Sequence, residues 1–296
     1  MMSYADRLAE VIDGFVDEAV AEATAPLRTR ILEQDETISQ LLERIAVLEK
    51  PKDPDGWVSF YDSTFEKNDG WTLRQETQSN DNSYNAPKNV IFGDGMTIVG
   101  RRESLGKRPY TSGDALGRHI QVPNYFRADV TAVLPTEYGQ WPCPLWFRPL
   151  THGDSGELDV CETWPYDWPQ TGAKAWATLW ENYTSKRKLN AGLPYAGLPN
   201  MDPAAPHTHT MVKTRGRLEV LIDGARVWCW ERGAKYIPSE RISPTPDWYD
   251  AVYEIPDRLW YPRVTLQIGG PNAQEPKPDW QESRMVVSRL RIYKEA

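Results

Sequence analysis

The sequence lacks the features of a membrane-spanning or disulfide-linked protein. None of its apolar stretches approaches the roughly 18 residues that a membrane-spanning helix needs. It has only 3 cysteines, Cys143, Cys161 and Cys229, an odd number without metal-like spacing. We therefore expect three reduced thiols and no disulfide framework. No basic segment followed by an apolar one stands near the start, so we expect no secretion signal.

The sequence also lacks an excess of basic charge. The 296 residues carry a formal net charge of −8, of which residues 1–50 contribute −6 and the remaining residues only −2. A nearly neutral main region without a basic stripe argues against binding to nucleic acid. The absence of a polybasic patch likewise argues against binding to an anionic membrane.

Phenylalanine is the rarest aromatic residue, with 6 Phe against 13 Trp and 14 Tyr. Trp and Tyr combine a flat apolar face with one polar group, which suits a wet binding surface better than a dry core. The 24 Pro and 20 Gly argue against a mainly helical protein.

Residues 1–50 have the periodicity of a helix that pairs with other copies. Their polar faces are rich in charge, and the apolar residues repeat every seven positions. Position a holds Ile31, Ile38 and Ile45, and position d holds Leu27, Gln34, Leu41 and Leu48. This pattern predicts a parallel coiled coil that makes a homodimer or a homotrimer. Residues 51–56 (Pro-Lys-Asp-Pro-Asp-Gly) are typical of a linker.

Residues 57–296 predict an all-β domain. Short β-branched and aromatic segments alternate with Gly, Pro, Asn and Asp, and no helical pattern separates them. Asp223-Gly224 stands between two such segments and predicts a tight hairpin. We expect a two-sheet antiparallel sandwich behind the helical segment.

Three acids lie close together in Ser155-Gly-Glu-Leu-Asp-Val-Cys-Glu162. On a strand Glu157 and Asp159 share one face, whereas Glu162 points to the other face unless a β-bulge intervenes. With a bulge, all three carboxyls face one cleft. Retaining glycosidases use two carboxyls about 5–5.5 Å apart, one as nucleophile and one as acid/base.

The same segment has another enzymatic interpretation and a non-catalytic one. Ser155 in Gly153-Asp-Ser-Gly156 resembles a serine-protease nucleophile, but Glu157 stands where such enzymes place a second Gly. A solvated acidic strand or a calcium-binding loop is the non-catalytic alternative. Six tryptophans around the acids favour a sugar cleft over a dry core, because each indole buried in a core needs a partner for its N–H. They are Trp141, Trp146, Trp164, Trp168, Trp176 and Trp180.

The acidic segment resembles the signature of the glycoside hydrolase family 16 enzymes, the laminarinase-like β-glucanases. Further segments resemble family motifs in the same order through most of residues 57–294. They are Pro87–Val99, Tyr110-Thr-Ser-Gly113, Gly139-Gln-Trp-Pro-Cys-Pro-Leu-Trp146, Val220-Leu-Ile-Asp-Gly224 and Val287-Ser-Arg-Leu-Arg-Ile-Tyr293.

The resemblance implies a concanavalin-like jelly roll with a sugar cleft on its concave face, and retaining endo-hydrolysis. It implies Glu157 as nucleophile, Glu162 as acid/base and Asp159 as supporting acid. The substrate contacts that we expect are Trp141, Trp146, Arg102, Trp164 and Trp180. The sequence departs from the family in lacking a His on the strand after the catalytic one, which leaves the substrate open.

No cofactor is expected. We expect no catalytic metal, while the resemblance leaves room for a structural Ca²⁺. His207-Thr-His209 has no third ligand nearby, so we interpret it as a polar loop rather than a metal site.

The function that we expect is hydrolysis of β-linked polysaccharide in a bacterial envelope. The stalk, the lack of a secretion signal and the sugar cleft together resemble a bacteriophage minor tail protein, located in the virion tail and acting outside the host. Two alternatives are a non-catalytic adsorption module, which would gain avidity from the stalk, and a structural tail protein with an idle cleft.

Overall fold

The computed structural model describes residues 53–163, 174–182, 186–194, 202, 204–237 and 239–296. The predicted coiled coil and the expected substrate contact Trp164 lie outside these residues. No helix in the described part of the chain has the length and apolar character needed to cross a bilayer.

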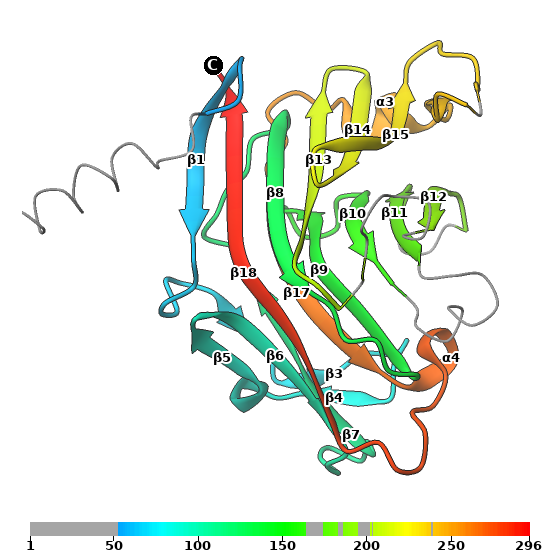
Figure 1. Ribbon diagram of the computed structural model, residues 1–296. Coiled ribbons are helices and arrows are strands. Elements are labelled where there is room, and N and C mark those ends of the chain that lie inside the picture. The colour runs from blue at the N-terminus through cyan, green and yellow to red at the C-terminus, as the bar shows by residue number, and fades with distance from the viewer. Residues whose placement is uncertain (1–52, 164–173, 183–185, 195–201, 203, 238) are drawn as a thin grey trace, which may run out of the picture. The chain divides into compact units, whose positions relative to one another are not determined.

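The described residues form two mainly antiparallel sheets with three short helical segments. The first sheet has the order β15–β14–β13–β8–β18, and β1 and β6 both pair with the other edge of β18. Its strands are β1 (Trp57–Ser63), β5 (Val90–Gly93), β6 (Gly95–Arg101), β8 (Phe126–Val133), β13 (His207–Thr214), β14 (Arg217–Ile222), β15 (Ala225–Glu231), β16 (Ile242–Pro244) and β18 (Glu282–Glu295). Figure 1 shows β18, in red, running the length of this layer.

The second sheet has the order β12–β11–β10–β9–β17–β7–β2. Its strands are β2 (Thr72–Leu73), β7 (Tyr110–Leu116), β9 (Gln140–Pro149), β10 (Glu157–Glu162), β11 (Lys174–Trp180), β12 (Lys188–Pro194) and β17 (Trp260–Ile268). Strand β7 also pairs with β6 and with β4, and so joins the two sheets at one edge. The remaining elements are β3 (Glu76–Thr77), β4 (Ser83–Asn85), the 3₁₀ helix Pro87–Asn89, α3 (Tyr249–Tyr253) and α4 (Gly270–Ala273).

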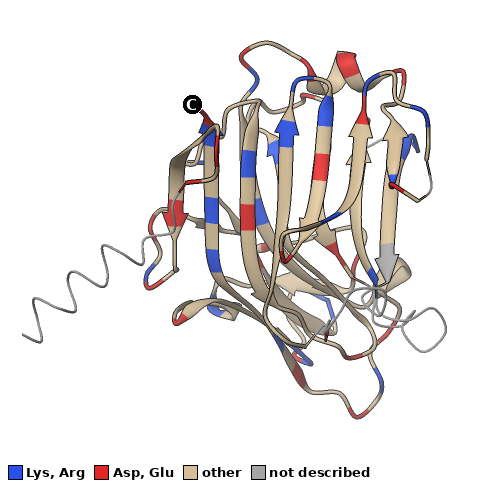
Figure 2. Ribbon diagram, turned by 45° about the horizontal axis from the view of Figure 1, so that its top comes forward, with Lys and Arg blue, Asp and Glu red and all other residues tan. Residues whose placement is uncertain are grey.

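The core lies between the two sheets. The rings of Phe126 on β8 and Phe147 on β9 lie 4.7 Å apart, and both side chains are fully buried. Met211 and Leu290 add to this core from the first sheet, and Leu145 adds to it from the second. The outward residues of β8, β13 and β14 are partly exposed, so these strands show the alternation of a sheet with one solvated face. Figure 2 shows basic and acidic residues interspersed along the ribbon.

Local sequence signals place several elements as predicted. Asp223 and Gly224 have φ values of 48° and 78°, the left-handed pair that a two-residue hairpin needs, and Ile222 pairs with Ala225 beside them. All three cysteines are free and buried in the fold.

The interpretation of His207-Thr-His209 as a polar loop is wrong. These residues begin β13, where His207 pairs with Ala132 and His209 with Val130 of β8. Two hydrogen bonds also hold the His207 side chain. Its Nδ1 lies 2.7 Å from Asp223 Oδ2, and its Nε2 lies 2.8 Å from the Asp202 carbonyl oxygen.

Candidate active site

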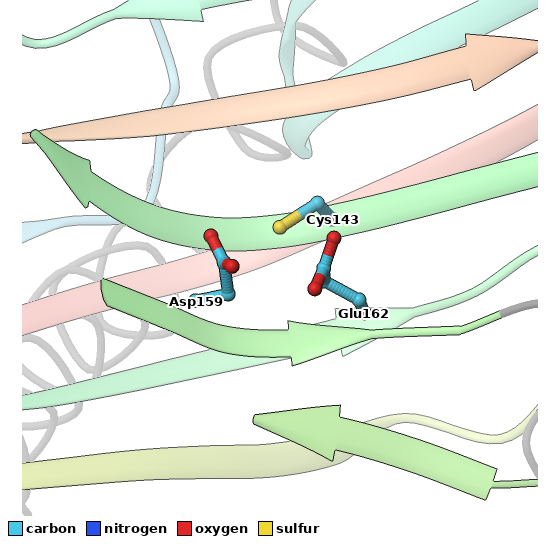
Figure 3. A group of neighbouring side chains, drawn as sticks. All are labelled: Cys143, Asp159 and Glu162. Atoms are coloured by element: carbon cyan, nitrogen blue, oxygen red, sulfur yellow. The ribbon is translucent and has the colours of Figure 1, made fainter. Parts of the chain in front are cut away.

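A β-bulge in β10 brings the three acids to one face of the second sheet. Asp159 pairs with Thr178 and Glu162 pairs with Trp176, so three steps along β10 match two steps along β11. The extra residue reverses the alternation and returns Glu162 to the side of Glu157 and Asp159. The predicted bulge is confirmed. Figure 3 shows Asp159 and Glu162 projecting from β10 to the same side.

Strand β9 has a matching irregularity that sequence reasoning missed. Arg263 pairs with Trp146 and Thr265 pairs with Cys143, so three steps along β9 match two along β17. Pro144 lies within these steps, where its missing N–H disturbs the ladder least. Trp141, Cys143 and Trp146 all line the cleft because of this extra residue.

Glu157 lies at the start of β10 and faces two arginines. Its Oε2 accepts a hydrogen bond of 3.0 Å from Arg148 Nη1, and its side chain is about one-fifth exposed. Burial raises the pKa of Glu157, while the positive charges of Arg148 and Arg263 act in the opposite direction. These cations favour the ionised carboxylate, which is the form a nucleophile needs.

Asp159 is the most deeply buried of the three acids, with 3% of its surface exposed. Its Oδ2 accepts a hydrogen bond of 3.2 Å from Trp180 Nε1. Burial, together with the charges of Glu162 and Glu157, raises the pKa of Asp159 well above its usual range. Asp159 is therefore suited to hold a proton between its two neighbours.

Glu162 is buried and has neutral donors. Trp141 Nε1 donates to Oε1 at 2.9 Å, and Thr178 Oγ1 donates to Oε2 at 3.2 Å. Burial, followed by the charge of Glu157, raises the pKa of Glu162 to about 7, although the two hydrogen bonds lower it. A carboxyl that is still partly protonated near neutral pH has the property of a general acid.

A buried network fixes Trp146 beside the acids. Trp146 Nε1 donates to Thr265 Oγ1 at 2.9 Å, and Thr265 Oγ1 donates to Asp114 at 3.1 Å. The Arg263 guanidinium lies 3.9 Å from the centroid of the Trp146 ring and forms an ion pair with Asp114. The sequence analysis did not select Arg148, Arg263, Thr178 or Thr265. Arg148 had a detectable signal, because it stands two residues after Trp146 on the same strand.

The acids lie on the floor of an open cleft of about 1000 Å³. Its lining residues come from β12, β11, β10, β9 and β17 in turn, and then from residues 74–80 and α4. These strands are neighbours in the sheet, so the cleft runs across the strands and is shaped for an extended chain. Trp180 lies in it beside Lys188, whose ammonium group is 4.7 Å from the indole centroid.

The structure brings Trp141, Trp146 and Trp180 together with the three acids, but not Arg102. The Nε and Nη2 groups of Arg102 donate to the carbonyl oxygens of Trp280 and Lys277, each at 2.8 Å. Its guanidinium also lies against the Tyr110 and Trp280 rings, and Arg102 does not line the cleft. Arg102 therefore holds two segments of the fold together and does not contact the site.

Two of the acids, Asp159 and Glu162, form with Cys143 the one group of potential metal ligands that the described residues contain. One ligand atom each from Cys143, Asp159 and Glu162 lies within 4.8 Å of the others. Figure 3 shows the three side chains next to one another. Burial raises the pKa of the Cys143 thiol well above its usual value. A thiol is not a ligand that Ca²⁺ takes, so this group does not fit the structural calcium considered above. That calcium ion stays a prediction for other parts of the chain.

The comparison with solved structures agrees with the fold, whereas the two sequence comparisons found no match. No protein-family model matches the sequence, and no curated protein matches it. The fold is nevertheless that of the catalytic domains of family 16 glycoside hydrolases. The laminarinase catalytic domain from Thermotoga maritima has a TM-score of 0.65 and 17% identity, with 82% of this chain and 100% of that chain covered. The laminarinase from Rhodothermus marinus has a TM-score of 0.66 and 20% identity, with coverage of 81% and 98%. The endo-β-1,3-glucanase from Pyrococcus furiosus has a TM-score of 0.65 and 17% identity, with coverage of 81% and 95%.

Proposed function

We propose that the chain is a retaining endo-glycosidase that hydrolyses β-linked polysaccharide. The observation that carries this proposal is the difference between two carboxyls on one face of β10. Glu157 faces arginines, whereas Glu162 is buried among neutral donors and has a pKa of about 7. Two carboxyls whose environments separate their proton affinities are the requirement for a nucleophile and an acid/base.

In the proposed mechanism the Glu157 carboxylate attacks the anomeric carbon while Glu162 donates its proton to the leaving oxygen. The products of this step are a covalent glycosyl-enzyme and a released sugar chain. Glu162, now ionised, removes a proton from water, and the resulting attack breaks the ester to Glu157. Asp159 hydrogen-bonds to Glu162 and shares its proton during this exchange of roles.

The cleft supports a polymeric substrate. It is open across the sheet, and its indoles offer flat faces on which sugar rings pack. One of the similar structures, a non-specific endo-β-1,3(4)-glucanase, was crystallised with 1,3-β-D-cellotriosyl-glucose. We therefore propose β-glucans as the first substrates to examine and bacterial envelope polysaccharides as the substrates of the intact protein.

The decisive experiment measures the release of reducing ends from β-glucans, galactans and bacterial envelope polysaccharides. Wild-type protein and Glu157→Gln are compared on each polymer, and glycan binding is measured for both. Release by the wild type alone supports the glycosidase. Binding by both proteins without release from any polymer would favour a glycan-binding adsorption module.

Replacing Trp141 by Phe is expected to move the alkaline limb of the kcat/KM profile to higher pH. The indole N–H stabilises ionised Glu162, so its removal raises the pKa of that carboxyl further, by about 1 unit. Trp180→Phe is the matched control, because it removes the donor to Asp159 instead. An alkaline limb that stays in place or moves to lower pH in Trp141→Phe would contradict this assignment.

We also propose that residues 1–50 assemble several copies of the chain, as part of a bacteriophage tail that acts on the host surface. Ile38 is a central heptad core position, so Ile38→Asp is expected to convert the full-length oligomer into monomers. Ser39→Asp adds the same charge at the next, outward position and should leave the oligomer intact. Light scattering after gel filtration reports both masses, and mass spectrometry of purified virions tests the tail assignment.

A further inference from the structure

The start of β10, where Glu157 lies, is held by a side chain from α3. Tyr253 Oη donates toward two carbonyl oxygens, Glu157 O at 2.7 Å and Trp180 O at 2.5 Å. The same oxygen accepts the Glu157 N–H at 3.3 Å. Glu157 and Trp180 are the last paired residues of β10 and β11 at this end. A single hydroxyl therefore closes the ladder where strand pairing stops.

Tyr253 itself is rigidly placed. Its side chain is fully buried, and its ring stacks on that of Trp260 at 5.6 Å with an interplanar angle of 11°. Its carbonyl oxygen accepts hydrogen bonds from Lys213 Nζ at 2.9 Å and from Asn124 Nδ2 at 3.0 Å. Asn124 Oδ1 in turn accepts the Trp260 indole N–H at 2.9 Å. Both the ring and the backbone of Tyr253 are thus fixed by buried partners.

The residues just before Glu157 are held against the same elements. Arg258 Nη1 donates to the Ser155 carbonyl oxygen at 2.7 Å. Gly156 has a φ of +110°, and a Cβ there would lie 3.0 Å from Val252 Cγ1 and 3.2 Å from the Trp260 ring. The backbone that leads into Glu157 therefore packs directly on α3 and Trp260.

We propose that Tyr253 is a positioning residue whose hydroxyl fixes the backbone of Glu157 and so aims its carboxylate at the anomeric carbon. The inference rests on the proposed role of Glu157 as nucleophile. Tyr253 does not touch the cleft, and its effect passes through the Glu157 peptide. A displacement of about 1 Å at a reacting group costs on the order of 10²-fold in rate.

The test is Tyr253→Phe, which keeps the ring on Trp260 and removes only the hydroxyl. We expect kcat on a soluble polysaccharide to fall about 10–100-fold while KM changes by less than about twofold, because attack geometry and not binding is altered. Tyr249→Phe is the control, since Tyr249 is equally buried on the same helix and its hydroxyl donates to neither carbonyl. A kcat for Tyr253→Phe equal to that of Tyr249→Phe, in folded protein, would overturn the proposal.

Hydrogen exchange gives a readout that does not depend on turnover. The amides of residues 157–159 should exchange faster in Tyr253→Phe than in wild type or Tyr249→Phe, because the end of β10 is released. If the wild type hydrolyses none of the polymers, the proposed function fails and exchange alone decides the positioning role. Unchanged exchange at these amides overturns that role in either case.

Discussion

Replacing Glu157 by Ala is expected to lower polysaccharide turnover by about 10⁴–10⁶-fold, the range that the loss of a catalytic nucleophile or its partners costs in a hydrolase. Removal of the carboxylate leaves no group that attacks the anomeric carbon. Sodium azide is expected to restore turnover in part, because the small anion enters the vacated space beside Arg148 and attacks from the same face. That attack inverts the anomeric centre once, so the product is an α-glycosyl azide.

Glu157→Gln provides the control for this rescue. The amide fills the space that azide needs, so turnover should stay low with or without the anion, while polysaccharide binding is retained. Glu162→Ala is expected to give the opposite stereochemistry on an activated aryl glycoside. Azide then attacks the glycosyl-enzyme on Glu157 and yields a β-glycosyl azide. A β-azide from Glu157→Ala would show that the two carboxyls have the reverse roles.

The core of the candidate site could be predicted from the sequence because it depends on one short segment. Side chains on a strand alternate, so the spacing of Glu157, Asp159 and Glu162 is compatible with one cleft only if a bulge intervenes. The register with β11 contains that bulge. The Asp223-Gly224 hairpin was predictable for the same reason, since its conformation depends on two adjacent residues.

The supporting residues could not be predicted, because their positions depend on pairing between distant strands. Arg263 reaches the acids only through the register of β17 with β9, more than 100 residues earlier in the chain. Arg102 shows the converse. Its place near a family motif predicted a sugar contact, but the structure directs its guanidinium to the carbonyl oxygens of Trp280 and Lys277. Such contacts are not visible in local periodicity.

Replacing Glu162 by Gln is expected to abolish hydrolysis of polysaccharide while sparing the first step of the reaction, measured as kcat/KM, on aryl glycosides with good leaving groups. A sugar alkoxide is a poor leaving group and departs only when its oxygen is protonated, whereas a dinitrophenolate departs without a proton. Wild-type kcat/KM should fall as pH rises through about 7, because the general acid loses its proton there. In Glu162→Gln the residual activity on the aryl glycoside should lose this alkaline limb. An unchanged limb would assign it to another group.

The same substitution should stabilise the fold at alkaline pH, which tests the environment of Glu162 without any substrate. The pKa of Glu162 is raised from 4.5 in the unfolded chain to about 7 in the folded one. The folded state therefore binds the proton more tightly, and stability is lost as pH rises from about 4.5 through about 7. This shift corresponds to about 3 kcal/mol of unfolding free energy at about pH 8.

Gln carries no charge at any pH. The unfolding free energy of Glu162→Gln should therefore exceed that of the wild type by about that amount at about pH 8 and match it at about pH 4. Urea unfolding at the two pH values measures the difference. Equal stabilities at about pH 8 would mean that Glu162 ionises there at no cost to the fold, and that its carboxyl lacks the raised pKa that a general acid requires.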